Sequence, residues 1–222
     1  RMFTLEAFSR MYGGAAGRDP VMAMLGQTGQ IALQGADILR TAPAMYSSTV
    51  EYAPNPLAQA MKSMSQVFLA GLGARVLYTS HRQFDTHSGQ LITHANLWND
   101  VAGAVGCFMD DLKEHGREDD VAVLIFSEFG RRVKDNGSGT DHGSGGSAFV
   151  IGNQVIGGLY GEYPSLEPDK QLEGDLQFNN DFRSTHSTIL EPWPSLEADP
   201  NGKGPLGQPG FPPRLGGFPE PR

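Results

Sequence analysis

Apolar residues recur at helical spacing in three stretches of the chain. The first covers residues 25–39, and the third covers residues 91–115, where Gly116 is expected to end the helix. Between them, Pro56 stands where a helix can begin, because the first turn does not need its missing N–H. The apolar positions of the second and third helices are Leu57, Met61, Met64, Val67, Phe68 and Leu72, then Leu97, Val101, Val105, Phe108 and Leu112.

Three shorter apolar runs have the length of β-strands: residues 74–79, 121–126 and 147–151. The run at 121–126 is continuously apolar, which is typical of a strand buried on both faces of a parallel sheet. Strands and helices in this order predict an α/β fold, with an open, mainly parallel sheet and helices on both faces. Binding sites in such sheets lie beyond the carboxyl ends of the strands.

The end of the chain differs in composition from the rest. Residues 191–222 are rich in Pro and Gly and hold few large apolar residues, so burial there cannot offset the entropy lost on ordering. We therefore expect one α/β domain over residues 1–190 and an extended Pro/Gly-rich tail over residues 191–222.

The charge and the cysteine content exclude several functions. A formal net charge of −8 argues against nucleic acid as a partner, because proteins that bind it carry a clustered basic face. No apolar run approaches the roughly 18 residues of a membrane-spanning helix, so no membrane span is expected. The single cysteine, Cys107, excludes an internal disulfide and a thiolate metal cluster. The oligomeric state stays open.

Three clusters of polar residues stand beside the predicted strands and hold three of the six histidines. Carboxylate and imidazole groups are the ligands expected for Zn²⁺ or a similar divalent ion in a hydrolytic site. The absence of thiolates favours a catalytic metal over a structural one. The clusters are Asp85-Thr86-His87 with His94 beyond, Ser127-Glu128-Phe129-Gly130-Arg131, and Thr140-Asp141-His142-Gly143.

Each cluster also has a simpler explanation. The first can cap a helix, because an Asp side chain accepts hydrogen bonds from free backbone N–H groups. Glu128 can pair with a neighbouring arginine, and His94 can be a surface residue. The Asp141-His142 pair can belong to an ordinary turn. Only the joint occurrence of the clusters favours a metal site.

Longer motifs around these clusters resemble one bacterial family. They are FDTH, SEFGRRV, GTDHG, VIGGLYGEYP and GDLQFNNDFRSTHSTIL, preceded by NPLAQAMKSMSQVFLAGLGARVLY. Over roughly residues 25–190, the chain is similar to the family named domain of unknown function 1501. This resemblance implies the alkaline phosphatase and sulfatase superfamily of metal-dependent hydrolases. It also implies a periplasmic or secreted location, since members are often exported, with a cytoplasmic location as the alternative.

The superfamily holds one or two metal ions on carboxylates and imidazoles at strand ends. By this resemblance, Asp85 and His87 stand where an Asp/His ligand pair is expected. Asp141 and His142 resemble a late ligand histidine and its neighbour. With Glu128 from the segment after the buried strand, the implied metal ligands are Asp85, His87, Glu128, Asp141 and His142.

The chain also departs from the superfamily pattern. Where relatives usually have an Asp-His pair, it reads Glu128-Phe129, which removes one imidazole from a full two-zinc site. His186 matches a position that is His in some relatives and Tyr in others, so its role, like that of His94, stays open. The superfamily's first strand supplies an early ligand Asp and then a nucleophile. This chain begins downstream of that region, which implies the C-terminal portion of the fold.

We therefore expect a metal-dependent hydrolase that cleaves a small phosphate or sulfate ester through a metal-activated water or hydroxyl group. Zinc is the expected cofactor, because imidazole favours softer ions, with manganese, calcium and magnesium as alternatives. Glu128 and Arg131 are the expected catalytic residues. Arg131, through its planar fork of donors, and Gly143 are expected to bind the anionic group of the substrate.

Two other functions stay open. The run from His142 to Gly146 faintly resembles the oxyanion loop of esterases, which suggests a metal-free carboxylester hydrolase, although no Gly-x-Ser-x-Gly motif accompanies it. The chain can also be a non-catalytic or partner-binding remnant of the fold, in which the ligand residues only support the structure. Its start downstream of the family's first strand and its Pro-rich tail favour this last interpretation.

Overall fold

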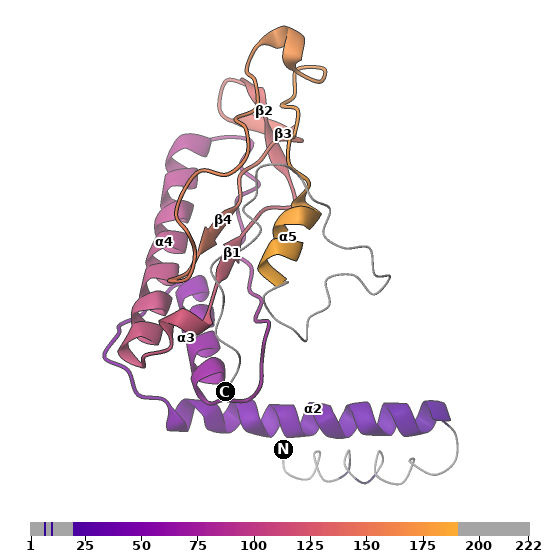
Figure 1. The fold of residues 1–222 in the computed structure, drawn as a ribbon, viewed down its shortest axis with the longest axis vertical. Helices are drawn as coiled ribbons and strands as arrows, with labels where there is room; N and C mark the ends of the chain where they lie inside the picture. The colour runs from indigo at the N-terminus through magenta and orange to yellow at the C-terminus, as the bar shows by residue number, and fades with distance from the viewer. Residues whose placement is uncertain (1–6, 8–9, 11–19, 191–222) are drawn as a thin grey trace. The chain divides into compact units, whose positions relative to one another are not determined.

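The computed structural model describes residues 7, 10 and 20–190, and the chain divides into two compact units, Arg1–Thr79 and Ser80–Arg222 (Figure 1). The expected tail over residues 191–222 lies outside the described residues. Among the helices that the structure describes, none has both the length and the apolar character that crossing a membrane requires.

In the first unit, α2 (Pro20–Met45) and α3 (Pro56–Leu69) contact each other. α3 begins where the sequence predicts, with Pro56 in its first turn. Asn55 is its N-cap, and the side-chain oxygen of Asn55 accepts a hydrogen bond from the N–H of Ala58 at 2.8 Å. The cap provides a partner for one of the N–H groups that the first turn leaves unpaired.

The predicted helices of this unit are confirmed, but its predicted strand is wrong. Residues 25–39 lie within α2, and Leu57 and Met61 of the predicted apolar stripe are buried. Residues 74–79 form no strand and pair with none of the strands that the structure describes. An apolar run becomes a strand only where a second strand supplies hydrogen-bond partners, and the spacing of apolar residues does not encode that partner.

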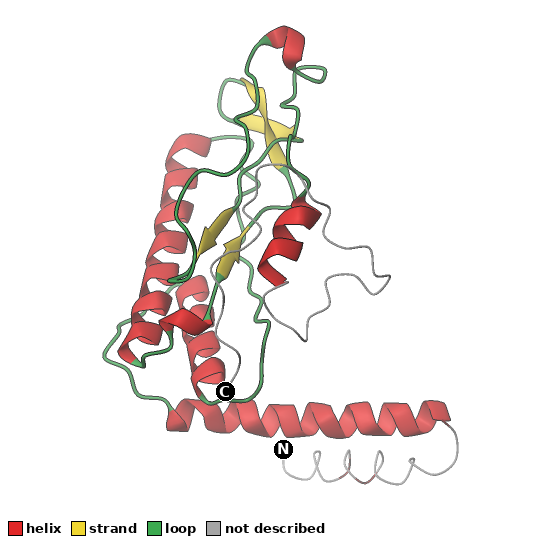
Figure 2. Cartoon of the chain, in the orientation of Figure 1, coloured by secondary structure: helices red, strands yellow, loops and turns green. Residues whose placement is uncertain are grey.

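The second unit combines a long helix, α4 (Gln90–Glu114), with short strands and a final helix, α5 (Phe182–Leu190) (Figure 2). α4 ends before Gly116, as predicted, and the positive φ of 63° at Gly116 is one that glycine adopts without steric cost. Short 3₁₀ turns lie at Glu118–Asp120 and Pro168–Lys170. All the predicted apolar positions of α4 are buried: Leu97, Val101, Val105, Phe108 and Leu112.

The strands form two separate antiparallel pairs (Figure 2). β1 (Val123–Ile125) pairs with β4 (Phe149–Ile151), and Leu124 lies opposite Val150. Between them in the chain, β2 (Gly130–Asp135) and β3 (Thr140–Gly143) form a hairpin with an irregular register.

The predicted open, mainly parallel sheet is therefore wrong for the part of the chain that the structure describes. Of the run 121–126, only Val123–Ile125 is a strand, and its residues are half-buried rather than fully buried. The connection from β1 to β4 contains the β2–β3 hairpin and no crossover helix, so β4 returns antiparallel to β1. An apolar run does not specify the direction of its partner strand.

Replacing the N-cap of α3 tests why this helix begins where it does. We expect Asn55→Ala to lower the free energy of unfolding by about 1 kcal/mol, because the N–H of Ala58 loses its acceptor. The matched control is Ser63→Ala on the exposed face of the same helix, which should change it by less than about 0.5 kcal/mol. Urea denaturation measures both, and equal effects would contradict the role of the cap.

The start of α5 offers a second test, based on charge. Hydrogen bonds from the side chain and the backbone N–H of Arg183 lower the pKa of Asp181 to about 2. Because this pKa is lowered, its stabilising contribution exists above the unfolded value near 3.9 and disappears as pH falls through about 2. An NMR titration should show the pKa of Asp181 rising in Arg183→Met. An unchanged titration curve would contradict the assignment.

Candidate metal centre

Asp85 and His87 lie two residues apart on the irregular segment that precedes α4. The chain turns tightly at Asp85, because the N–H of Thr86 donates to the carbonyl oxygen of Phe84 at 2.8 Å. Thr86 is buried, while Asp85 and His87 on either side of it are exposed. The spacing Asp-x-His therefore presents a carboxylate and an imidazole on one side.

His142 comes from β3, where it lies opposite Arg131 of β2. Asp141 precedes it, and consecutive residues of a strand point to opposite faces. The Asp141 carboxylate instead accepts a hydrogen bond from Asn136 Nδ2 at 3.2 Å. β3 thus contributes one ligand-type side chain to the site and turns the other away.

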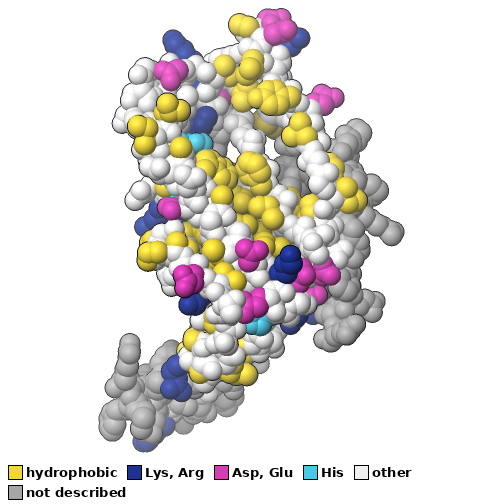
Figure 3. Space-filling model, turned by 90° about the vertical axis from the view of Figure 1, so that its left-hand side faces the viewer, with side chains coloured by type: hydrophobic (Ala, Val, Ile, Leu, Met, Phe, Trp, Pro, Cys, Tyr) yellow, Lys and Arg dark blue, Asp and Glu magenta, His cyan; other side chains and the backbone are white. Residues whose placement is uncertain are grey.

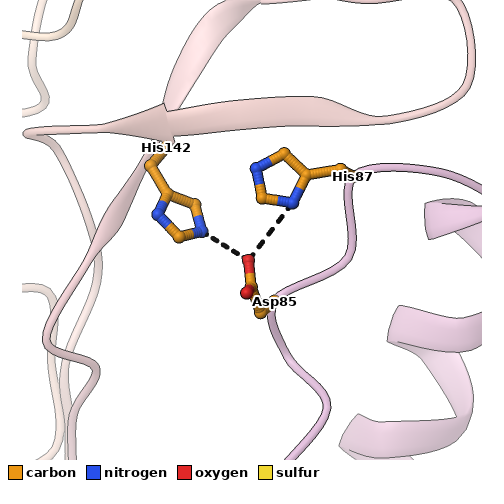
Figure 4. Close-up of side chains that lie close together, drawn as sticks. All are labelled: Asp85, His87 and His142. Carbon is orange, nitrogen blue, oxygen red and sulfur yellow. Dashed lines mark hydrogen bonds and ion pairs between the residues drawn. The ribbon is translucent and has the colours of Figure 1, made fainter.

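The structure brings Asp85, His87 and His142 together. Figure 4 shows both imidazoles directed at the same carboxylate oxygen: His142 Nε2 lies 2.6 Å from Asp85 Oδ1, and His87 Nδ1 lies 3.2 Å from it. The three potential ligand atoms all lie within 4.8 Å of one another. The side chains are 64% exposed for Asp85, 47% for His87 and 44% for His142, so the site is open to solvent.

These distances fit a divalent ion. Bonds of about 2.0 Å to a tetrahedral Zn²⁺ place two of its ligand atoms roughly 3.3 Å apart. The separations of 2.6 and 3.2 Å between Asp85 Oδ1 and the two imidazole nitrogens lie near that spacing, and all three atoms lie within 4.8 Å of one another. Two imidazoles and one carboxylate form a recognised ligand set for a catalytic metal, because they leave coordination positions free for water or substrate.

An aromatic ring fixes the orientation of one ligand. The Phe129 ring stacks on the His142 imidazole, with 4.1 Å between the ring centroids and 16° between the planes. The His87 and His142 rings lie 4.8 Å apart and are tilted by 38°. Phe129 occupies the position where the resemblance implies another imidazole, so here an apolar ring packs on the candidate ligand His142.

Arg131 uses its side-chain donors on the protein itself. It donates to the carbonyl oxygen of Thr140 at 2.5 Å, to that of Phe84 at 2.6 Å, and to Thr86 Oγ1 at 3.4 Å. The guanidinium carbon also lies 5.1 Å from the centroid of the Phe129 ring. All three acceptors are neutral, so none of them offsets the positive charge of the guanidinium beside the candidate ligands.

The loop of the β2–β3 hairpin holds the segment that carries His87. Asn136 Nδ2 donates to the carbonyl oxygen of His87 at 3.2 Å. The Asn136 side-chain oxygen accepts from the N–H groups of Ser138 and Gly139, which closes the turn. Ser138 accepts from the N–H groups of Gly89 and Gln90 at 2.9 and 3.2 Å, so the loop also caps the start of α4.

The remaining candidates from the sequence lie outside the group of three ligands. Glu128 is exposed in the loop between β1 and β2. His94 packs edge-on against the Phe84 ring, with 5.5 Å between the centroids. His186 Nδ1 lies 2.8 Å from the carbonyl oxygen of Phe182 on the same helix.

Gly143 has a steric role in the structure. A Cβ atom there would lie 2.6 Å from the backbone carbon of Arg131 and would clash with the carboxylate of Asp175. That carboxylate accepts from the N–H of Ser144, with 3.1 Å to each of its oxygens. The glycine therefore permits the close approach of Asp175 and β2 to the end of β3.

Sequence reasoning missed the role of the residues that support the candidate ligands. They are neutral or apolar, except for Asp175, and carry no metal-binding signal themselves. The run Asn136-Gly137-Ser138-Gly139 does predict a turn, because Asn side chains bond their own backbone and glycine adopts turn conformations readily. The missed residues are Thr86, Phe129, Asn136, Ser138 and Asp175.

Comparison with protein families supports the resemblance seen in the sequence. The family model described as "Protein of unknown function (DUF1501)" matches residues 14–191, and the chain belongs to this family. No curated protein and no solved structure shows significant similarity to the chain. The matched range contains every residue of the candidate metal centre.

A substitution at Gly143 tests how tightly β3 is held. We expect Gly143→Ala to destabilise the chain by about 2 kcal/mol, because the added methyl group meets the backbone of β2 and Asp175. Gly146→Ala is the matched control, since the nearest atom to its Cβ would lie at an ordinary 3.6 Å. Chemical denaturation compares them, and equal stability of the two variants would contradict this packing.

Proposed function

We propose that this protein is a metal-dependent hydrolase of phosphate or sulfate esters. The observation that carries the proposal is the convergence of Asp85, His87 and His142, whose potential ligand atoms lie within 4.8 Å of one another. The three side chains come from two segments more than fifty residues apart in sequence and meet where solvent reaches them.

Asp85, His87 and His142 would hold the ion, with Zn²⁺ as the first choice and Mn²⁺, Ca²⁺ or Mg²⁺ as alternatives. A divalent ion bound there would polarise the ester and lower the pKa of water at the site. The stacked ring of Phe129 keeps the His142 imidazole directed at the site. Binding requires free imidazole nitrogens, so we expect metal affinity to fall as the solution becomes more acidic.

The positive charge of Arg131 favours an anionic substrate. Its guanidinium lies against the Phe129 ring and bonds only neutral acceptors, so the field of its charge extends to the site. The likeness to the alkaline phosphatase and sulfatase superfamily supports the choice of phosphate and sulfate esters. The likeness lies in the kinds of ligand side chain, because the described residues do not form the open parallel sheet expected of that superfamily.

A metal-free carboxylester hydrolase has less support. An oxyanion hole needs free N–H groups directed at the developing negative charge. Within the loop after His142, the N–H of Ser144 already donates to the carboxylate of Asp175, and Ser144 Oγ donates to the carbonyl oxygen of Leu176. A carboxylate at this position would repel an oxyanion.

A non-catalytic, partner-binding role is the second candidate, and exposed apolar residues favour it. Large apolar side chains of the second unit are open to solvent, including Leu159, Tyr163 and Phe182. Hydrophobic side chains of the described residues are also visible at the surface in Figure 3. Exposed apolar surface often marks a protein interface. Under this candidate, the purified chain would hold no stoichiometric metal and would hydrolyse none of a panel of esters.

Replacing one ligand tests the metal hydrolase. We expect Asp85→Asn to lower Zn²⁺ affinity at least about 10-fold and to lower hydrolysis of p-nitrophenyl phosphate or sulfate in parallel, because the amide lacks the ligand's charge. The matched control is Asp169→Asn, an exposed residue of the 3₁₀ turn Pro168–Lys170. Elemental analysis and ester assays with and without chelator measure the effect. Full activity after complete metal removal would reject the proposal.

A further inference from the structure

The Arg131 guanidinium bonds to both segments that supply the candidate ligands. One nitrogen donates to the carbonyl oxygen of Thr140 on β3, two residues before His142. The other donates to the carbonyl oxygen of Phe84 and to Thr86 Oγ1. Phe84 and Thr86 flank Asp85, so the fork of donors holds both sides of that ligand.

We propose that Arg131 is a positioning residue that fixes the distance between Asp85 and His142. This inference rests on the proposed function, since it concerns how the same site is held ready for an ion. It assigns the arginine a role different from direct contact with substrate, because the donors are directed at backbone carbonyls of the protein.

The chemistry of the side chain explains why arginine suits this position. A guanidinium is rigid and planar, so two of its nitrogens can hold two carbonyl groups at a fixed spacing. A lysine ammonium is a single point on a flexible stem and cannot reproduce that fork. The Phe129 ring, 5.1 Å from the guanidinium carbon, further limits its motion. Replacing Arg131 with lysine therefore keeps the positive charge and removes the planar pair of donors.

Two neighbouring interactions do not replace the fork. Asn136 bonds the carbonyl oxygen of His87, and Thr140 Oγ1 donates to Gln90 Oε1, so both act on the C-terminal side of Asp85 only. The direct contact from His142 to Asp85 is itself between ligands, and an ion would replace it. The Phe84 ring also packs edge-on against other rings, but Arg131 bonds β3 and the residues on both sides of Asp85, whether or not an ion is bound.

The test compares Arg131→Lys with Arg132→Lys, because both variants keep the charge and only the first removes the fork. Arg132 is the next residue of β2 and its side chain is exposed, so it points to the opposite face. We expect Arg131→Lys to bind Zn²⁺ at least about 10-fold more weakly than the unsubstituted chain, and Arg132→Lys to bind it equally. Isothermal titration calorimetry measures the affinities.

A spectroscopic measurement separates positioning from general stability. With Co²⁺ at saturation, Arg131→Lys should shift the visible absorption bands, because the ligand geometry changes, while Arg132→Lys leaves them in place. Unchanged bands and a Zn²⁺ affinity within two-fold of the unsubstituted chain would overturn the proposal. If the unsubstituted chain binds no Zn²⁺, the proposed function fails instead.

If Arg131→Lys does not fold, NMR of the unsubstituted chain tests whether the Arg131 guanidinium is held in place. A held guanidinium gives separate signals for its two terminal nitrogens, because rotation about the Nε–Cζ bond is slow. We expect separate signals for Arg131 and one averaged signal for the exposed Arg132. Averaged signals for Arg131 would overturn the inference, independently of whether any metal binds.

Discussion

The attachment of the β2–β3 hairpin to the segment before α4 is the constraint on which the candidate site depends. Asp85 and His87 lie on one side of this contact and His142 on the other, so no two-segment ligand set exists without it. Arg131 joins the segments beside Asp85, and the hairpin loop joins them again at the start of α4. The long-range hydrogen bonds offset the entropy of closing a long loop.

The supporting groups around the site are mostly neutral, and this has a consequence for its chemistry. Backbone carbonyls and hydroxyls accept the hydrogen bonds of Arg131, so the arginine charge is not cancelled by a carboxylate. The carboxylate of Asp85 can therefore interact with the histidines and an ion rather than with the arginine. A metal ion bound at this site and the nearby Arg131 would together favour an anionic substrate over a neutral one.

The competing functions differ in which local feature they explain. The esterase hypothesis uses the glycine-rich loop, but the N–H of Ser144 in that loop already donates to the Asp175 carboxylate. The partner-binding hypothesis uses the exposed apolar side chains of the second unit, which the hydrolase does not explain. The metal hydrolase hypothesis uses the two imidazoles directed at one carboxylate oxygen in a solvent-exposed position.

The sequence by itself determined three of the described helices and the kinds of side chain near the candidate site. α3, α4 and the stop at Gly116 follow from local periodicity and caps, and the polar clusters contain Asp85, His87 and His142. Only the tertiary structure decided the directions of the strands and which candidates meet. Asp141 and His142 are adjacent in sequence, yet the pleat of β3 turns them to opposite faces. Periodicity is a local property, whereas strand pairing and convergence depend on contacts between distant segments.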